Sequence, residues 1–164
     1  MKKYFIVFIF SLLAIGNSMA QAPNYQKEIN EQVWLPFIES YGSNNSEAFM
    51  ALHSKDLVRV TVDNKVIQLF DSYKYTTERG NSNRKNLNIK PSIEFRFVQR
   101  IANDQAAYEV GYYKVTSNEP TGVSYFYGKF TVVLRKESGK CKITVDSDSS
   151  EGITESVFNS GQKM

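Results

Sequence analysis

The chain has 164 residues, of which 20 are Lys or Arg and 17 are Asp or Glu, so its formal net charge is +3. This length suits one domain with a sizeable core, and the scattered basic residues indicate no nucleic-acid-binding surface. One cysteine, Cys141, excludes an internal disulfide, and together with one histidine, His53, it provides no zinc-ligand set. Phosphate-loop, dinucleotide and G-x-S-x-G motifs are all missing from the sequence. The sequence therefore predicts no metal, no cofactor and no nucleic-acid partner.

Residues 1–20 have the pattern of a secretory signal peptide. Lys2 and Lys3 precede an apolar run over 4–15, and small residues ending at Ala20 suit a signal peptidase. The apolar run is shorter than the ~20 residues that a membrane span needs. Loss of the two lysines would leave 18 of the 20 basic residues against 17 acidic ones, a net charge of about +1. We expect an exported protein, periplasmic or extracellular, with no membrane contact after cleavage.

The first predicted element of the remaining chain is a helix over 24–41, with Asn24 as its N-cap and Pro36 bending it or loosening the preceding turn. A short second helix is predicted after Asn44, which forms a capping-box pattern with Glu47. Apolar side chains recur at helical spacing in the first segment: Ile29, Val33, Phe37, Ile38 and Tyr41.

The period then changes twice. Residues 57–62 alternate as a strand, with Leu57, Arg59 and Thr61 on one face. Residues 66–80 return to helical spacing, and Gly80 is predicted to end this third helix. A polar loop is expected after it.

Four alternating segments follow Pro91, namely 92–101, 106–115, 123–136 and 141–148. Short turn sequences join them, which predicts an antiparallel meander. Gly111 and Gly128 lie inside strands, where glycine marks a bend or a close approach. The tail, 151–164, is predicted to be polar and frayed, although its apolar residues could dock: Ile153, Val157 and Phe158.

Helices followed by strands predict an α+β domain over 21–150, in which three helices cover one face of a curved sheet. The element order and the stretches 33–60, 93–100, 106–115 and 128–148 resemble the NTF2-like superfamily, in particular its small exported SnoaL-like/DUF4440 branch. This resemblance implies a cystatin-like cone with an open mouth. It also implies a homodimer through the sheet, whereas it fixes no activity, because the superfamily includes both enzymes and proteins without known activity.

The candidate chemistry centres on Asp146 and Asp148, which share one face of the last strand. If that face is the outer one, the acids only solubilise it; if it faces the cone, they join charged residues of neighbouring strands in a polar pocket. An adjacent arginine would lower the pKa of an aspartate, which favours structure or anion binding over base catalysis. The predicted pocket-lining residues are Trp34, Arg59, Tyr73, Arg96, Glu109, Tyr113, Tyr127, Asp146 and Asp148.

Three candidates for acid–base chemistry are Asp146, His53 and Tyr113. His53 is expected at a helix C-terminus, where it would interact with the helix dipole, or alternatively at the pocket mouth. Cys141 is expected to be a buried strand thiol. We therefore expect a domain that binds a small ligand; an acid–base enzyme of the isomerase or dehydratase type and a structural dimeric module are the alternatives.

Overall fold

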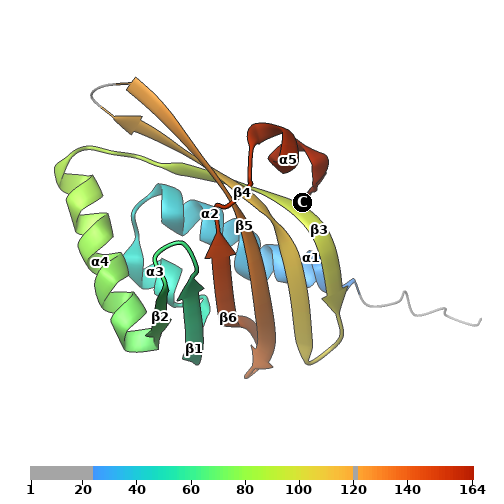
Figure 1. Ribbon diagram of the computed structural model, residues 1–164. Coiled ribbons are helices and arrows are strands. Elements are labelled where there is room, and N and C mark those ends of the chain that lie inside the picture. The colour runs from blue at the N-terminus through green and yellow to red at the C-terminus, as the bar shows by residue number, and fades with distance from the viewer. Residues whose placement is uncertain (1–23, 120–121) are drawn as a thin grey trace, which may run out of the picture.

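The structure, a computed structural model, describes residues 24–119 and 122–164. A curved seven-stranded sheet has the order β2-β1-β6-β5-β4-β3-β7. The early helices lie against one face of this sheet, and α5 lies on the other (Figure 1). Neighbouring strands pair antiparallel except for β1 and β6, which are parallel. The predicted α+β cone is confirmed.

The first helix is continuous but changes its winding. It consists of α1 (Tyr25–Ile29), the π-helical turn η1 (Asn30–Trp34) and α2 (Leu35–Gly42). The Asn24 side chain accepts a 3.0 Å hydrogen bond from the Lys27 amide, as its predicted capping role requires. The π turn ends at Trp34, two residues before Pro36, which has no N–H to donate to the preceding turn. The predicted loosening of that turn is confirmed.

The next helix begins one residue later than predicted. The N-cap of α3 (Ser46–Met50) is Asn45, whose side chain accepts from the Ala48 amide at 3.1 Å. Asn44 instead adopts a positive φ of 52° and donates from its side chain to the Ile89 carbonyl. The chain then enters β1 (His53–Thr61), so the sheet starts earlier than the alternation at 57–62 indicated.

The predicted third helix, 66–80, is partly wrong. Its first residues form β2 (Val66–Leu69), which pairs with β1, and α4 (Phe70–Asn86) continues through Gly80. Helix α4 ends where Asn88 takes a positive φ of 54°, a conformation that commonly stops a helix. The apolar residues in 66–69 are compatible with both the helical and the strand period, and pairing with β1 makes this segment a strand.

The predicted meander is confirmed, as β3 (Ser92–Ala102), β4 (Ala106–Glu119), β5 (Gly122–Glu137) and β6 (Lys140–Ser149). Two register shifts interrupt it, one at Val98 between Phe97 and Gln99, the other at Thr144 between Ile143 and Val145. Each inserts one extra residue, so side chains after the shift exchange faces relative to simple alternation.

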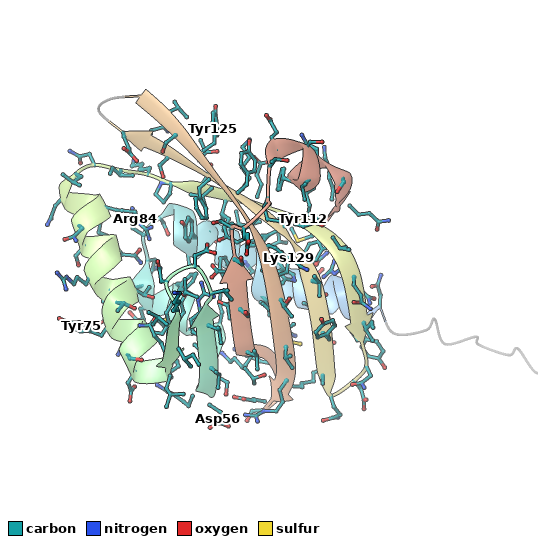
Figure 2. The ribbon with its side chains drawn as sticks, in the orientation of Figure 1. Asp56, Tyr75, Arg84, Tyr112, Tyr125 and Lys129 are labelled. Carbon is teal, nitrogen blue, oxygen red and sulfur yellow. The ribbon has the colours of Figure 1, made fainter. Side chains whose placement is uncertain are left out.

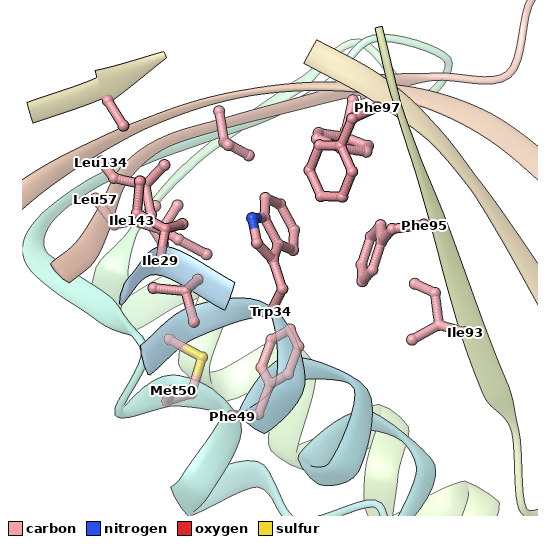
Figure 3. Close-up of a cluster of buried hydrophobic side chains, with 14 of the residues drawn as sticks. Ile29, Trp34, Phe49, Met50, Leu57, Ile93, Phe95, Phe97, Leu134 and Ile143 are labelled. Atoms are coloured by element: carbon pink, nitrogen blue, oxygen red, sulfur yellow. The ribbon is translucent and has the colours of Figure 1, made fainter. Parts of the chain in front are cut away.

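Trp34 lies at the centre of the core. It reaches from the helix toward the sheet, between Phe95 and Phe97 on one side and Ile143 and Leu57 on the other (Figure 3). Its ring centroid lies 4.7 Å from that of Phe95 and 5.3 Å from that of Phe97. The early helix and the late sheet therefore share one aromatic core.

The tail is docked rather than frayed, which is the second of the two outcomes that the sequence allowed. It forms α5 (Glu155–Ser160) and β7 (Gln162–Lys163), and β7 pairs with β3. Phe158 is only 2% exposed, and its ring lies 5.8 Å from the ring of Tyr127. This one apolar anchor docks the tail on the outer face of the sheet.

Candidate functional site

A cavity of about 330 Å³ lies between the early helices and the inner face of the sheet. Aromatic and aliphatic side chains form most of its wall, and the charged ones gather on β1 and β6. Ligand pockets usually combine such an apolar wall with a few placed polar groups. The lining residues are Trp34, Phe37, Tyr41, Phe49, Arg59, Tyr73, Ile93, Phe95, Tyr113, Val115, Phe126, Phe130, Val132, Asp146 and Asp148.

The polar part of the wall is an ion-pair cluster around Arg59. Its Nη1 lies 3.4 Å from Oδ1 of Asp146, and its Nη2 lies 2.6 Å from Oδ2 of Asp148. The parallel register that pairs Arg59 with Asp146 and Thr61 with Asp148 brings these side chains together. Arg59 also donates from Nη1 to the Val60 carbonyl at 3.1 Å. One guanidinium thus holds both carboxylates of the last strand.

The bulge at Thr144 is what turns the two acids inward. Sequence alternation placed Asp146 on the face opposite to Ile143, yet both face the interior because Thr144 is an extra residue between them. The Thr144 hydroxyl donates to the Val133 carbonyl at 3.1 Å, which stabilises the irregular pairing. The interpretation in which Asp146 and Asp148 face the cone is therefore the one that the structure supports.

Burial and charge act in opposite directions on these groups. Burial raises the pKa of Asp146, Arg59 lowers it, Asp148 raises it, and the net shift is upward. Burial opposes the charge of Arg59, but the Asp146 carboxylate and its neighbours outweigh that effect and raise its pKa. Burial, followed by the charge of Asp148, raises the pKa of Tyr113 above its usual range. At neutral pH Arg59 is therefore charged and Tyr113 is a neutral phenol.

Tyr113 joins the cluster because the strand beside it has no side chain at one position. Its hydroxyl donates to Oδ2 of Asp148 at 3.1 Å, and its Cα pairs in register with Gly128. A Cβ on Gly128 would lie 2.4 Å from Cζ of the Tyr113 ring. Gly128 therefore provides the space in which the tyrosine lies across β5, which is the close approach predicted for a mid-strand glycine.

Tyr73 and Trp34, both predicted to line the pocket, come from helices. The Arg59 guanidinium lies 5.5 Å from the centroid of the Tyr73 ring. Burial raises the pKa of Tyr73, an effect that Arg59 partly offsets. Trp34 is the only tryptophan of the sequence, and it forms part of the cavity wall.

Three predicted pocket residues lie elsewhere. Arg96 and Tyr127 are on the outer face with Phe158, whose ring centroid is 5.1 Å from the Arg96 guanidinium. The same face carries the cross-strand pair of Tyr112 and Lys129, which Figure 2 labels. The prediction assumed that one strand face carried all the polar residues, whereas in the register Arg96 is opposite Tyr112 and not Tyr113.

Glu109, the third, faces inward but is walled off from the cavity. It is fully buried, and its Oε1 lies 2.7 Å from Nε of Arg100. The bulge at Val98 places Arg100, rather than Gln99, opposite Glu109. This acid therefore belongs to an ion pair of the core and not to the cavity wall.

His53 lies three residues beyond the last residue of α3 and contacts the C-terminal turn of that helix, as one of the two predictions for it stated, and it does not line the cavity. It is the first residue of β1 and is 4% exposed. Its Nδ1 donates to the Phe49 carbonyl at 3.0 Å, and its Nε2 has no hydrogen-bond partner among the residues that the structure describes. Burial lowers its pKa to about 4. His53 is therefore a neutral core residue.

The apolar half of the wall was missed as a site by sequence reasoning. Phe95, Phe130 and Val132 follow strand alternation, but the same pattern describes core packing and cavity walls alike. Tyr41 and Phe49 followed helical spacing in the same way. Residues that the prediction did not assign to the pocket are Phe37, Tyr41, Phe49, Ile93, Phe95, Val115, Phe126, Phe130 and Val132.

Within residues 24–119 and 122–164, no group of three or more His, Cys, Asp and Glu side chains could hold a metal ion. Over the same ranges, no helix is long and apolar enough to cross a bilayer. Cys141 is a free cysteine and is half-buried. Its backbone amide donates a hydrogen bond to Oε1 of Gln32. The charged cluster at Arg59 is thus the feature of the cavity that can orient a ligand.

No protein-family model matches the sequence, and no curated protein matches it. Solved structures do match. An NTF2-like protein of unknown function from Shewanella oneidensis is 16% identical with a TM-score of 0.62, over 76% of this chain and 98% of its own. A candidate scytalone dehydratase from Novosphingobium aromaticivorans is 15% identical with a TM-score of 0.63, over 79% and 89%.

A second protein from Novosphingobium aromaticivorans, NTF2-like with a cystatin-like fold, is 9% identical with a TM-score of 0.62, over 80% of this chain and 85% of its own. These likenesses establish that the chain has the NTF2-like fold, as its sequence stretches suggested. At such low identity they carry no activity over to this chain.

Proposed function

We propose that this protein binds a small, largely apolar molecule in the cavity between its early helices and its sheet. The observation that carries the proposal is a cavity of about 330 Å³ with aromatic walls and one cluster of charged side chains. That volume is at the lower end of the range of ~300–1,000 Å³ for ligand pockets. The ligand is therefore the size of one or two rings, with a polar group at one end.

The pairing of both aspartates with Arg59 supports binding over acid–base catalysis. A catalytic base needs a carboxylate free to take a proton, and Asp146 and Asp148 are each within ion-pair distance of Arg59. The upward pKa shift of Asp146 is the one observation that favours an isomerase- or dehydratase-type enzyme. A purely structural role is less well supported, because the Phe and Tyr side chains line the cavity without filling it.

The proposal is tested with N-phenyl-1-naphthylamine, a neutral apolar probe whose fluorescence rises on leaving water. We expect saturable binding, and a Val115→Trp variant, which extends a wall residue into the cavity, should weaken it at least tenfold. The matched control is Val98→Trp, since Val98 lies on the surface at 58% exposure. Unchanged affinity in Val115→Trp with native circular dichroism, or no saturable binding by the parent protein, would refute the proposal.

We further propose that the protein acts outside the cytoplasm, on the signal-peptide pattern of residues 1–20. These residues lie outside the part that the structure describes. Mass spectrometry of the protein recovered from its own cells tests this directly. A mature N-terminus at Gln21 in an extracytoplasmic fraction is expected, and an intact Met1 in the cytoplasm would contradict it.

A homodimer through the outer face of the sheet is also proposed. Ile101 and Tyr108, which pair in register, remain 57% and 40% exposed on that face, whereas α5 covers another part of it. Light scattering should give twice the monomer mass, and Tyr108→Glu should halve it by placing a charge in the interface. A monomer at high protein concentration would exclude this assembly.

A further inference from the structure

The charged cluster in the cavity contains more acidic than basic side chains. Among the lining residues, Asp146 and Asp148 are acidic, Arg59 is basic, and no other residue of that wall has a permanent charge. The tyrosines of the wall do not supply a negative charge at neutral pH. With both carboxylates ionised, the formal charge of the cavity wall is −1.

Arg59 has little left to offer an anion. Its Nη1 donates to the Val60 carbonyl and to Asp146, and its Nη2 donates to Asp148. Its Nε is buried without a partner among the described residues, so a ligand in the cavity does not reach it. An anionic ligand would need the guanidinium fork, which the two aspartates already occupy.

The acids, in contrast, keep free acceptors. Asp146 Oδ2 and Asp148 Oδ1 make no hydrogen bond to any residue in 24–119 or 122–164, because the contacts of these carboxylates use the other oxygen of each. Tyr113 donates its only hydroxyl hydrogen to Asp148, so its remaining capacity is also that of an acceptor. Apart from the buried Nε–H of Arg59 and one N–H of its Nη2, the unused capacity of the cluster accepts hydrogen bonds.

We propose, building on the binding function above, that the cavity selects small aromatic amines in their cationic form, with the ammonium group bound by Asp146 and Asp148. The ammonium group supplies three donors and one positive charge, which match the free acceptors and the net charge. Electron-rich ring faces on the wall, those of Trp34, Tyr73 and Tyr113, also favour a cation. The ring of the ligand lies against the apolar part of the wall.

The test compares three probes of nearly equal shape by isothermal titration calorimetry at pH 7: 2-naphthylmethylamine, 2-naphthylmethanol and 2-naphthoate. We expect the amine to bind at least tenfold more tightly than the alcohol, and the carboxylate to bind more weakly than both. Tight binding of naphthoate, or equal affinity for amine and alcohol, would overturn the amine inference while leaving the binding function intact.

Variants locate the effect. Asp148→Asn should weaken amine binding at least tenfold and change alcohol binding less than threefold, because it removes charge but keeps shape. Glu94→Gln is the matched control, since Glu94 is half-exposed on β3 and pairs with Lys114. If Asp148→Asn leaves the amine affinity unchanged, or weakens it no more than Glu94→Gln does, this inference is wrong. It is also wrong if the amine fails to bind a protein that still binds N-phenyl-1-naphthylamine. Failure of every probe would remove the binding function as well.

Discussion

Trp34 and Glu109 are 75 positions apart in the chain, and the indole Nε1 donates a 2.5 Å hydrogen bond to Oε2 of Glu109. The other carboxylate oxygen accepts from Nε of Arg100, whose Nη2 donates to the side chain of Asn30. This network fixes the indole that forms part of the cavity wall. It also ties the first helix to β3 and β4.

Replacing that acid should cost stability. Glu109→Gln leaves Arg100, whose side chain is only 17% exposed, without its counter-charge, and breaking one partner of a buried pair costs about 3–5 kcal/mol. We expect the free energy of unfolding in urea to fall by about that amount. Glu94→Gln, which breaks the half-exposed pair with Lys114, should change it by less than about 1 kcal/mol. Equal effects of the two changes would show that burial of the Glu109 pair does not matter.

His53 should make the protein less stable in acid. Its pKa is about 4 in the fold and about 6.5 in a model peptide, so the unfolded chain binds more protons between these values. Its contribution to the free energy of unfolding is about 3 kcal/mol; it is fully present above pH 6.5 and is lost as the pH falls toward 4. We expect His53→Gln to flatten the pH dependence of the unfolding free energy in this window. A variant that retains the full wild-type slope would assign the slope to other groups.

Two glycines should respond to alanine in opposite directions. A Cβ on Gly80, inside α4, would meet nothing within 4 Å, so Gly80→Ala should stabilise the protein by about 0.5–1 kcal/mol. A Cβ on Gly111 would lie 2.1 Å from the Arg96 carbonyl oxygen, so Gly111→Ala should destabilise it by about 2 kcal/mol or more. Thermal unfolding of both variants measures this. Shifts of the same sign would contradict the close packing described at Gly111.

The docked tail makes a further prediction. Phe158→Ala removes a side chain that is 2% exposed, and such a truncation costs about 3–5 kcal/mol where the site cannot collapse. Denaturant unfolding should show a loss of this order. Tyr125→Ala, on the projecting β4–β5 hairpin (Figure 2) and 59% exposed, should have little effect on stability. A Phe158→Ala protein as stable as the parent would mean that α5 contributes little to the fold.

Much of the fold was accessible from the sequence, because local chemistry encodes it. The alternation after Pro91, the cap at Asn24 and the effect of Pro36 each depend on a few neighbouring residues. The strand at 66–69 and the docking of Phe158 depend on partners far along the chain. Apolar residues in those segments allowed more than one structure, and tertiary contacts selected one.

The candidate site was only partly accessible, and the reason is geometric. Arg59, Tyr113, Asp146 and Asp148 have the residue types that a polar pocket needs, so they could be proposed from chemistry. The sheet face that each of them occupies depends on the strand register. The residue types at Val98 and Thr144 do not predict the bulges that change this register. The error at Arg96 has a different origin: this residue lies opposite Tyr112, and the prediction had placed the polar residues of all strands on one face.

The bulge at Thr144 means that the β6 sequence is compatible with two different interiors. Regular pairing throughout would direct Val145 and Ser147 into the hollow and leave both aspartates in solvent, without changing a single amino acid. The polarity of the cavity therefore depends on the position of one β-bulge, and amino-acid composition alone does not determine it.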